Sequence, residues 1–564
     1  MRRWRVLALA LAVLAGAGCR RREGASAAAP VPPEAPAAPD AAARRRVVIG
    51  ITQEPDTLWM PMKQMNASEH IGRSGALALT AFDERWQLVP LAAETIPTLD
   101  NGGVTLFQDA GQTRMRVTWR LREGLFWADG VPVTADDFVF TWRLTLDPSI
   151  EIVDRTAAER VVDMKAADPR TLVVTWGEPN AYYAVFRNHE VLPRHLVEPE
   201  LVRLGGKLKE SSFGLTPVLG GAFTIREWVP GSHIVAEKNP HARPAAHLDE
   251  IVWRILPDTT TLEANLLAGS IDAISVIGLT FDQAQAFAAR NDPRFEVVFT
   301  RALHWEHLDL NLDNPLLQDR RVREALLWAL DRQGLVDAVF GGKLEVAHGT
   351  RPPGAPYHNP ELPQRRLDPA RAAALLDDAG WRTGPDGVRE KDGVPLRLEL
   401  VSTAGDKLRE QVEQVLVAQW RAVGVDVVVQ NQPAKVLFGD TMRHRKFGAM
   451  AMFTWSLDPV QVNESWWRCD QVPRADNGWR GQNFPGFCLP RADALLAQIA
   501  RELDDEKRAT LARELEQVLA TELPQLPLYF RTEVSVIPKG FRGWRPVGIL
   551  QSQAWNAQEW AWPP

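Results

Sequence analysis

The 564-residue sequence has only three cysteines, and beyond its N-terminus it has no apolar run of about 18 residues, which excludes a multi-pass membrane protein. Most of the chain also lacks excess positive charge. Residues 1–46 carry nine bases and three acids, so the totals of 65 bases and 71 acids leave 56 bases and 68 acids, a net charge of −12, for the rest. This acidic body lacks the basic surface that nucleic-acid binding requires. The 21 Trp and 20 Phe exclude disorder.

The sequence also lacks the short motifs of common enzyme classes. In Gly72–Gly75 the serine is followed directly by glycine, whereas the nucleophile elbow G-x-S-x-G has one residue between them. Gly341–Lys343 is followed by leucine, whereas a phosphate-binding loop continues with Ser or Thr. His304 and His307 are three residues apart in a strand-like stretch, so we expect them on opposite faces and not around a zinc ion. We therefore predict no catalytic residues, no cofactor and no metal site.

The N-terminus has the parts of an export signal. Met1–Arg5 is basic, Val6–Gly18 is apolar, and Leu14–Cys19 resembles a bacterial lipoprotein cleavage box, in which the cysteine becomes a lipidated N-terminus. One departure is Gly16, which stands where an apolar residue is usual. The alternative is an ordinary signal peptide that leaves a soluble periplasmic protein. We expect residues 1–19 to be a lipoprotein signal peptide that anchors the protein at the periplasmic face of the envelope through Cys19.

Residues 20–46 are rich in Ala and Pro and have no apolar periodicity. Pro-rich segments of this kind stay extended and do not pack. We therefore predict a linker between the membrane anchor and the folded part of the chain.

The other two cysteines, Cys469 and Cys488, form an even pair in a loop-like segment. An exported protein can form disulfides, and no nearby Cys or His completes a four-ligand metal set. We predict a disulfide between them. Two buried free thiols are the alternative.

From residue 47 the chain alternates strand-like and helix-like segments without repeats, which indicates an α/β protein of several lobes. We predict strands at 47–51, 116–121, 396–401, 425–430 and 447–455. We predict helices after Thr134, over 320–341 as one stretch, after Asp368, within 406–423 and within 504–523.

Residues 117–148, VTWRLREGLFWADGVPVTADDFVFTWRLTLDP, form the longest specific pattern. It closely resembles the signature of peptide-class extracellular solute-binding proteins, the dipeptide and oligopeptide receptors of ABC importers. The matching residues are Leu121-Arg122, Gly124, Trp127, Asp129-Gly130, Pro132, Thr134-Ala135, Asp137 and Trp142. Further similar blocks follow in the family's order at Gly220–Pro240, Asp249–Asp272, Asp319–Arg332 and Asp504–Tyr529.

The resemblance implies a type II periplasmic-binding-protein fold of three lobes, with a ligand cleft between the two main lobes. Lobe I would comprise residues 47–88, 214–305 and 527–564, lobe II residues 89–213, and lobe III residues 306–526. The implied function is the substrate-binding component of an ABC importer, a monomer without enzyme activity that captures peptides and delivers them to the permease. A secreted hydrolase, and a sensor or chaperone on the same fold, are the alternatives.

The resemblance also implies two ligand-binding segments. In peptide receptors a strand ends at the cleft with a Trp, followed three residues later by an Asp that pairs with the α-ammonium group of the ligand. The matching residues here are Trp455, Ser456, Leu457 and Asp458. Alternatively, Asp458 only closes a turn by bonding its own backbone. Gln64, Met65 and Asn66 fall where relatives line the cleft with main-chain groups.

Overall fold

The structure, a computed structural model, describes residues 45–63, 65–150, 152, 155–185, 190–549 and 553–564. The predicted signal peptide with Cys19, nearly all of the predicted linker, and Gln64 lie outside these ranges. None of the helices within the ranges is both long and apolar enough to cross a membrane.

An 11-stranded sheet runs through the molecule. Its order is β18 (Asp426–Val429), β17 (Arg397–Val401), β19 (Met450–Ser456), β12 (Phe295–Leu310), β20 (Gln525–Pro538), β11 (Ala273–Ile274), β1 (Arg46–Ile51), β10 (Glu250–Ile255), β9 (His233–Lys238) and β8 (Phe223–Val229), with β13 (Glu345–Val346) pairing with β20. Four of the five predicted strands are confirmed in this sheet as β1, β17, β18 and β19, with small shifts at their ends, and the fifth lies in the second sheet as part of β5 (Gln112–Arg120). Neighbours in this sheet come from distant parts of the chain, as in an α/β fold.

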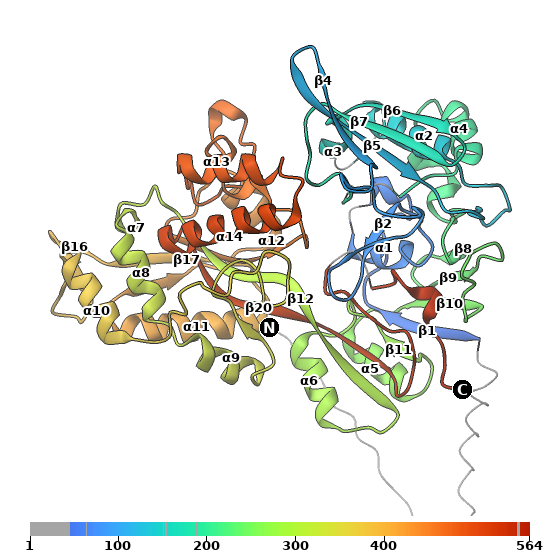
Figure 1. The fold of residues 1–564 in the computed structure, drawn as a ribbon. Coiled ribbons are helices and arrows are strands. Elements are labelled where there is room, and N and C mark those ends of the chain that lie inside the picture. Colours follow the sequence, from blue (N-terminus) through green and yellow to red (C-terminus); the bar gives the residue numbers. More distant parts are fainter. Residues whose placement is uncertain (1–44, 64, 151, 153–154, 186–189, 550–552) are drawn as a thin grey trace, which may run out of the picture.

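The two halves of this sheet meet at the antiparallel pair β12–β20. Its register runs from Phe295 opposite Pro538 to Asp309 opposite Gln525, while β12 also pairs with β19 and β20 also pairs with β11. Figure 1 shows the helices of residues 315–522 on one side of this pair and strands β1 and β8–β11 on the other. The lobe boundary predicted after residue 305 falls inside β12, so a continuous strand crosses it.

A second sheet of four strands carries the signature block. Its order is β4 (Val104–Asp109), β5 (Gln112–Arg120), β7 (Thr171–Trp176) and β6 (Val161–Asp168), with α2 (Ala135–Leu146) packed on it. Thr134 caps α2 as predicted, because the Asp137 carboxylate accepts its N–H at 2.8 Å. The same carboxylate accepts the N–H of Arg194, at the start of α4 (Arg194–Arg203), at 3.0 Å. The motif is therefore structural: Trp127 and Asp137 are buried where helix, loop and sheet meet.

Several of the helices between β12 and β20 begin at aspartate caps. The carboxylates of Asp368, Asp406 and Asp504 accept backbone N–H groups at the starts of α10 (Pro369–Asp378), α11 (Lys407–Ala422) and α14 (Asp505–Glu522). These three helices lie where the sequence predicts helices. The prediction of one helix over 320–341 is wrong. The stretch forms α8 (Arg320–Trp328) and α9 (Arg332–Phe340), because Asp331 accepts the N–H of Gly334 at 2.8 Å and starts a new helix.

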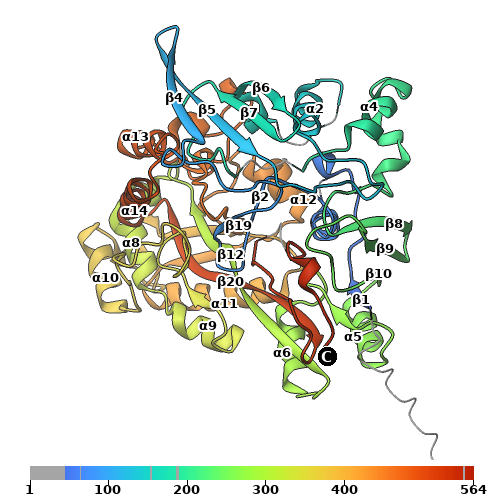
Figure 2. The same ribbon diagram turned by 45° about the vertical axis from the view of Figure 1, so that its right-hand side comes forward.

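The remaining elements are short. The helices are α1 (Asn66–Gly72), α3 (Thr156–Glu159), α5 (Thr259–Leu267), α6 (Phe281–Ala289), α7 (Pro315–Gln318), α12 (Ala434–Val436) and α13 (Pro490–Ile499). The strands are β2 (Thr80–Phe82), β3 (Leu88–Pro90), β14 (Arg382–Thr383), β15 (Arg389–Lys391) and β16 (Val394–Pro395). Figure 2 shows the four-stranded sheet above the central strands β19, β12 and β20.

Candidate binding site

A cavity of about 720 Å³ lies between the region of the four-stranded sheet and the segment that follows β19. The first wall includes Thr156, Ala157, Arg160, Trp176, Glu178, Asn180, Tyr182 and Val185. The second includes Ser456, Leu457, Asp458, Gln461, Asn463, Glu464, Ser465, Trp466, Arg468, Asp470, Gln471 and Gln482. The lining holds four carboxylates against two guanidinium groups, a net charge of −2. Its size suits a small-molecule ligand, and its charge suits a cation.

The two walls touch each other directly. The N–H of Val462 donates to the Tyr182 hydroxyl at 3.2 Å, and the N–H of Ala181 donates to the carbonyl of Ala500 at 2.8 Å. Arg501 and Glu178 form an ion pair at 2.6 Å. These contacts bring residues from the two sides of the cavity together, so its shape depends on how the two sides are placed.

Asp458, two residues past β19, lies on the cavity wall in a turn. Its Oδ1 accepts the N–H groups of Val460 at 3.0 Å and Gln461 at 2.8 Å, which is the turn interaction considered above as the alternative. Among the described residues, none donates a hydrogen bond to Oδ2. The turn and a ligand role are thus geometrically compatible, because one carboxylate oxygen orients the group and the other is left for a ligand.

A buried arginine holds the same turn from behind. The Arg351 guanidinium donates to the carbonyls of Asp458 at 2.5 Å, Pro459 at 2.8 Å and Gln461 at 2.8 Å. Three hydrogen bonds from one planar group restrict the backbone of the turn, and they bring positive charge near the carboxylate. The position of the Asp458 carboxylate is therefore fixed before any ligand binds.

Trp455 supports the wall without lining the cavity. Its ring stacks on Trp466 with centroids 4.8 Å apart and lies 6.0 Å from the nearly parallel ring of Phe484. Trp466 itself lines the cavity. The Trp455 ring thus packs behind another aromatic ring of the wall, and its role in ligand binding stays a prediction.

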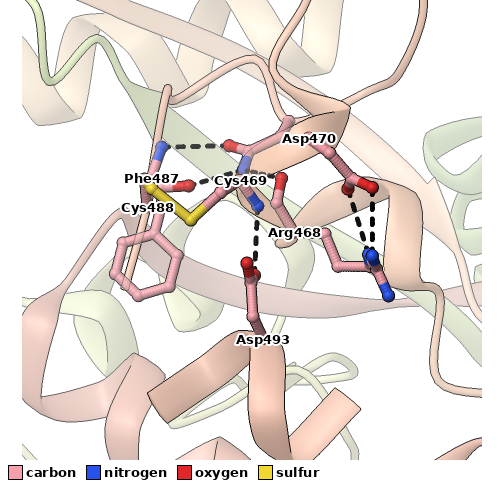
Figure 3. Close-up of a disulfide and its surroundings, with 7 residues drawn as sticks. Arg468, Cys469, Asp470, Phe487, Cys488 and Asp493 are labelled. Carbon is pink, nitrogen blue, oxygen red and sulfur yellow. Dashed lines mark hydrogen bonds and ion pairs between the residues drawn. A yellow bond between two sulfur atoms is a disulfide. The ribbon is translucent and has the colours of Figure 1, made fainter. Parts of the chain in front are cut away.

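The cysteines lie in the loop that supplies much of the second wall. Cys469 and Cys488 form a disulfide, with Cα atoms 4.6 Å apart (Figure 3). The Cys469 N–H donates to the carboxylate of Asp493, in α13, at 3.0 Å, and the buried Asn483 amide donates to the carbonyls of Arg468 at 2.9 Å and Phe487 at 2.6 Å. The disulfide therefore braces the segment that contributes Arg468, Asp470, Gln471 and Gln482 to the wall.

The second predicted ligand-binding segment lies elsewhere. Met65 and Asn66, at the start of α1, are exposed and do not line this cavity, and Gln64 is outside the described ranges. The N–H of Met65 donates to the carboxylate of Asp56 at 3.3 Å. The structure thus brings together Ser456, Leu457 and Asp458 on one wall and leaves Met65 and Asn66 apart from them.

An ion-pair network crosses the pair β12–β20 close to this wall. Glu306 is fully buried, and its carboxylate pairs with Arg409 at 2.8 Å and Arg531 at 2.8 Å and accepts a hydrogen bond from the Thr454 hydroxyl. Burial acts to raise the pKa of Glu306, but the charges of Arg531 and Arg409 outweigh it and hold the pKa at about 2. Glu306 is therefore ionised at neutral pH, and it joins its own strand β12 to α11, β19 and β20.

The two histidines of β12 point away from each other, as the strand alternation predicts. His307 stacks on Trp305 with centroids 4.1 Å apart, whereas His304 is close to Arg531 and His70 on the other face. Within the described ranges, no three His, Cys, Asp or Glu side chains are grouped so that they can hold a metal ion.

Sequence reasoning missed the first wall and the ion-pair network. Asn180 and Tyr182 follow β7 in a segment without any recognised motif, so no local pattern marked them. Charged residues within predicted strands were the available signal for the network: Glu306 lies in a stretch that alternates polar residues with leucines, and Arg531 follows the apolar run Leu526–Phe530. Such residues are rarely buried unless they are paired.

Comparisons with known proteins agree with this architecture. Residues 108–474 match the model of the bacterial extracellular solute-binding proteins, family 5, middle region. The chain is similar to the oligopeptide-binding protein AppA of Bacillus subtilis, with 26% identity over 513 residues and 88% of each chain covered. It is also similar to the nickel-binding periplasmic protein of Escherichia coli, with 27% identity over 425 residues, 73% of this chain and 78% of the relative.

Among solved structures, the chain is similar to the oligopeptide-binding protein of Thermus thermophilus, determined with a pentapeptide. The TM-score is 0.69 and the identity 28%, and the match covers 92% of this chain and 96% of the other. This likeness confirms the predicted type II fold.

The first prediction concerns Glu306. Glu306→Gln should lower the free energy of unfolding at pH 7 by about 3 kcal/mol, because it leaves the guanidinium groups of Arg409 and Arg531 with only the more distant carboxylate of Asp406. The folded-state pKa lies below the unfolded value of about 4.3, so the stabilisation by Glu306 is complete above that value and is lost as the pH falls towards 2. Urea unfolding from pH 7 down to pH 3 should show the difference shrinking. Glu296→Gln, at an exposed position of the same strand, is the control; an equal loss in both variants would contradict the role of the network.

The second prediction concerns the disulfide. Replacing Cys469 and Cys488 together with Ser should lower the free energy of unfolding by about 3 kcal/mol, because the bond restricts the unfolded chain. Thermal unfolding of the variant against the wild type measures this loss, and peptide mapping without reductant detects the bond. Alkylation of both thiols in the native, unreduced protein would show that the bond is absent.

Proposed function

Because the chain belongs to the bacterial extracellular solute-binding proteins of family 5, we propose that its solute is a peptide, which it captures between its lobes and delivers to the transmembrane subunits of an ABC permease. The observation that carries this proposal is the fixed Asp458 carboxylate on the wall of an acidic interlobe cavity. In this proposal the protein is a monomeric receptor and not an enzyme.

The chemistry of the cavity suits a peptide. A carboxylate with one uncommitted oxygen can form charge-assisted hydrogen bonds with the α-ammonium group that every free peptide carries. Around Asp458 lie amide and hydroxyl side chains, which donate and accept hydrogen bonds and so match a peptide backbone whatever its sequence: Asn180, Gln461, Asn463, Ser465, Gln471 and Gln482.

The relatives show that the family accepts different solutes, since their names include oligopeptide-, nickel- and deoxycholate-binding proteins. A bare metal ion fits the described residues of this chain poorly, because no metal-ligand group occurs among them. An acidic cavity also disfavours an anion such as a bile acid. A peptide with a free amino terminus fits both constraints.

In this proposal the lobes have the predicted boundaries, and β12 and β20 act as the hinge. Lobe II supplies Tyr182 and lobe III supplies Val462, and these residues already touch across the cavity. A ligand bound between the walls contacts both sides only when the lobes are closed, so it shifts the equilibrium towards the closed form. The closed form would then dock on the permease.

Membrane attachment through Cys19 is part of the same proposal. A lipid on Cys19, followed by an extended linker over residues 20–46, would keep the receptor near its permease.

The third prediction is that Cys19→Ser moves the protein from the membrane fraction of its own host into the soluble periplasmic fraction. Fractionation followed by mass analysis of the mature N-terminus measures this. A soluble wild-type protein that starts at another residue would show that Cys19 is not lipidated.

The fourth prediction tests Asp458. Asp458→Asn should weaken peptide binding by about 1.5–3 kcal/mol, ten- to hundredfold, because it removes the charge that binds the ammonium group. The Asn oxygen can still accept the N–H groups of the turn, so the melting temperature of the unliganded protein should change little. Calorimetric titration with free and N-acetylated forms of one peptide is the measurement.

Acetylation should weaken binding to the wild type about as much as the substitution does, and it should have little further effect on Asp458→Asn. Equal affinity of the wild type for free and acetylated peptides would remove Asp458 from this role. The same samples test the class of function: intact peptide recovered at one molecule per protein supports a receptor, whereas hydrolysed peptide supports an enzyme.

A further inference from the structure

We propose that a second cavity, which lies beside α9 and β13, binds a small organic dianion, a phosphate monoester or a dicarboxylate. This basic cavity measures about 650 Å³ and shares no lining residue with the acidic cavity that holds Asp458. The inference goes beyond the proposed function and does not depend on it, because it concerns a different cavity and a ligand of opposite charge.

The lining of the basic cavity has an excess of positive charge. Four arginines line it against two carboxylates, a net charge of +2 when the histidines are counted as neutral, whereas the acidic cavity has −2. A concave site of this size and sign attracts small anions. The charged residues and histidines of the lining are Asp331, Arg332, Glu345, His348, Arg351, His358, Arg365 and Arg366.

The two carboxylates of the lining are engaged elsewhere. Oδ1 of Asp331 accepts the N–H of Gly334 at 2.8 Å and caps α9. Glu345 pairs at 3.3 Å with Arg301, which does not line the cavity. Within the described part of the chain, neither carboxylate forms an ion pair with an arginine of the lining. The positive excess is therefore not neutralised from inside the cavity.

Arg332 is the most deeply buried of these charges, with 4% of the residue exposed. Its guanidinium donates to the carbonyls of Pro527 at 3.0 Å and Arg365 at 2.7 Å, and to that of Ala347. No carboxylate of the described residues pairs with it, and its buried Nε has no hydrogen-bond partner among them. Burial and the charge of Arg365 lower its pKa to about 10, so it is still a cation at pH 7. A buried cation whose partners are all neutral is stabilised by an anion.

Arg365 and Arg366 supply further N–H donors. Arg365 is 8% exposed, and the carboxylate oxygen of Glu324 lies 3.8 Å from its Nε, beyond hydrogen-bond distance. Arg366 is exposed, and its guanidinium contacts only the amide oxygen of Gln364, at 3.5 Å, among the described residues. Guanidinium groups bind phosphate and carboxylate through paired N–H donors. Both side chains therefore retain donors for an anion.

Arg351 adds its charge to the cavity but few donors. It is buried, and its guanidinium already holds the carbonyls of the Asp458 turn. The anion would thus be bound mainly by Arg332, Arg365 and Arg366.

His348 adds a neutral donor to this group. Its Nδ1 lies 3.5 Å from Nη2 of Arg332, and because a guanidinium has no acceptor, Nδ1 accepts there and Nε2 carries the proton. Burial and the positive charges of Arg332, Arg366 and His358 lower the pKa of His348 to about 4, so the ring is neutral at pH 7. Because these charges all act on one ring, they surround one part of the cavity. Nε2–H has no hydrogen-bond partner among the described residues and can donate to an anion.

The rest of the lining suits the organic part of such a ligand. Several apolar residues line the cavity: Val346, Pro353, Pro360, Leu362, Leu367 and Phe530. An inorganic ion would fill only part of a cavity of this volume. The net charge of +2 matches a phosphate monoester, which carries about −1.5 to −2 at pH 7.

The fifth prediction uses phenyl phosphate and phthalate as dianionic probes, with inorganic phosphate and benzyl alcohol as partial mimics. Calorimetric titration of the purified protein at pH 7 and low ionic strength should show one site for at least one dianion. That probe should bind about tenfold more tightly than inorganic phosphate, because the apolar wall contacts its ring. Benzyl alcohol, which lacks the charge, should show no saturable binding. The comparison of the two dianions identifies the head group as phosphate or dicarboxylate.

Two variants test the arginines. Arg365→Gln should weaken binding of the better probe at least about tenfold, because it removes charge-assisted hydrogen bonds. Arg366→Gln changes an exposed side chain, so the protein should fold normally and still bind several-fold more weakly. Arg491→Gln, at an exposed position of α13 outside the lining, is the matched control and should bind like the wild type. Wild-type affinity in both lining variants would contradict the inference.

Hydrogen exchange of the wild-type protein locates the site without any variant. The bound probe should slow exchange of backbone amides within residues 345–367, which supply most of the lining. Slower exchange confined to residues 456–482, in the wall of the acidic cavity, would place the anion there and overturn the inference. It is also overturned if neither dianion binds, or if both bind no more tightly than inorganic phosphate. Each of these results leaves the peptide receptor untouched, because peptide binding is measured at the other cavity.

Discussion

The antiparallel pairing of β12 with β20 is the constraint on which the rest of the structure depends. Each strand is hydrogen-bonded to the other over most of its length and to a different half of the sheet on its far side. The chain can therefore form two bodies that share one sheet. The second wall of the cavity follows β19, in one half of this sheet, whereas the first wall comes from the region of the separate four-stranded sheet.

Side-chain chemistry divides this pair of strands into an apolar packing face and a charged face. Trp305 and Phe530 contribute to an apolar core, which aligns the strands. Glu306 and Arg531 lie on the opposite face, where their mutual charges offset the loss of water. Because the carboxylate and the guanidinium groups pair with each other, this face carries buried charges that already have their partners.

Local parts of the fold were predictable from sequence, and distant contacts were not. Aspartate caps at positions 368, 406 and 504 act within three residues, so their patterns can be read directly. The break between α8 and α9 was missed, although it has the same physical cause, because the apolar periodicity continues across Asp331. The Asp458 turn was foreseen as an alternative to a ligand role, whereas the structure shows that the two are compatible. The partners of Glu306 lie more than a hundred residues away in the chain, and no local pattern connects them.

The disulfide between Cys469 and Cys488 has a consequence for the thermodynamics of binding. A long loop that first became ordered around its ligand would subtract the entropy of ordering from the affinity. Here the bond, the Asn483 amide and the Asp493 carboxylate order the loop when the protein folds. The disulfide thus preorganises this wall of the cavity, and because disulfides form in oxidising compartments, the order of the loop is linked to where the chain folds.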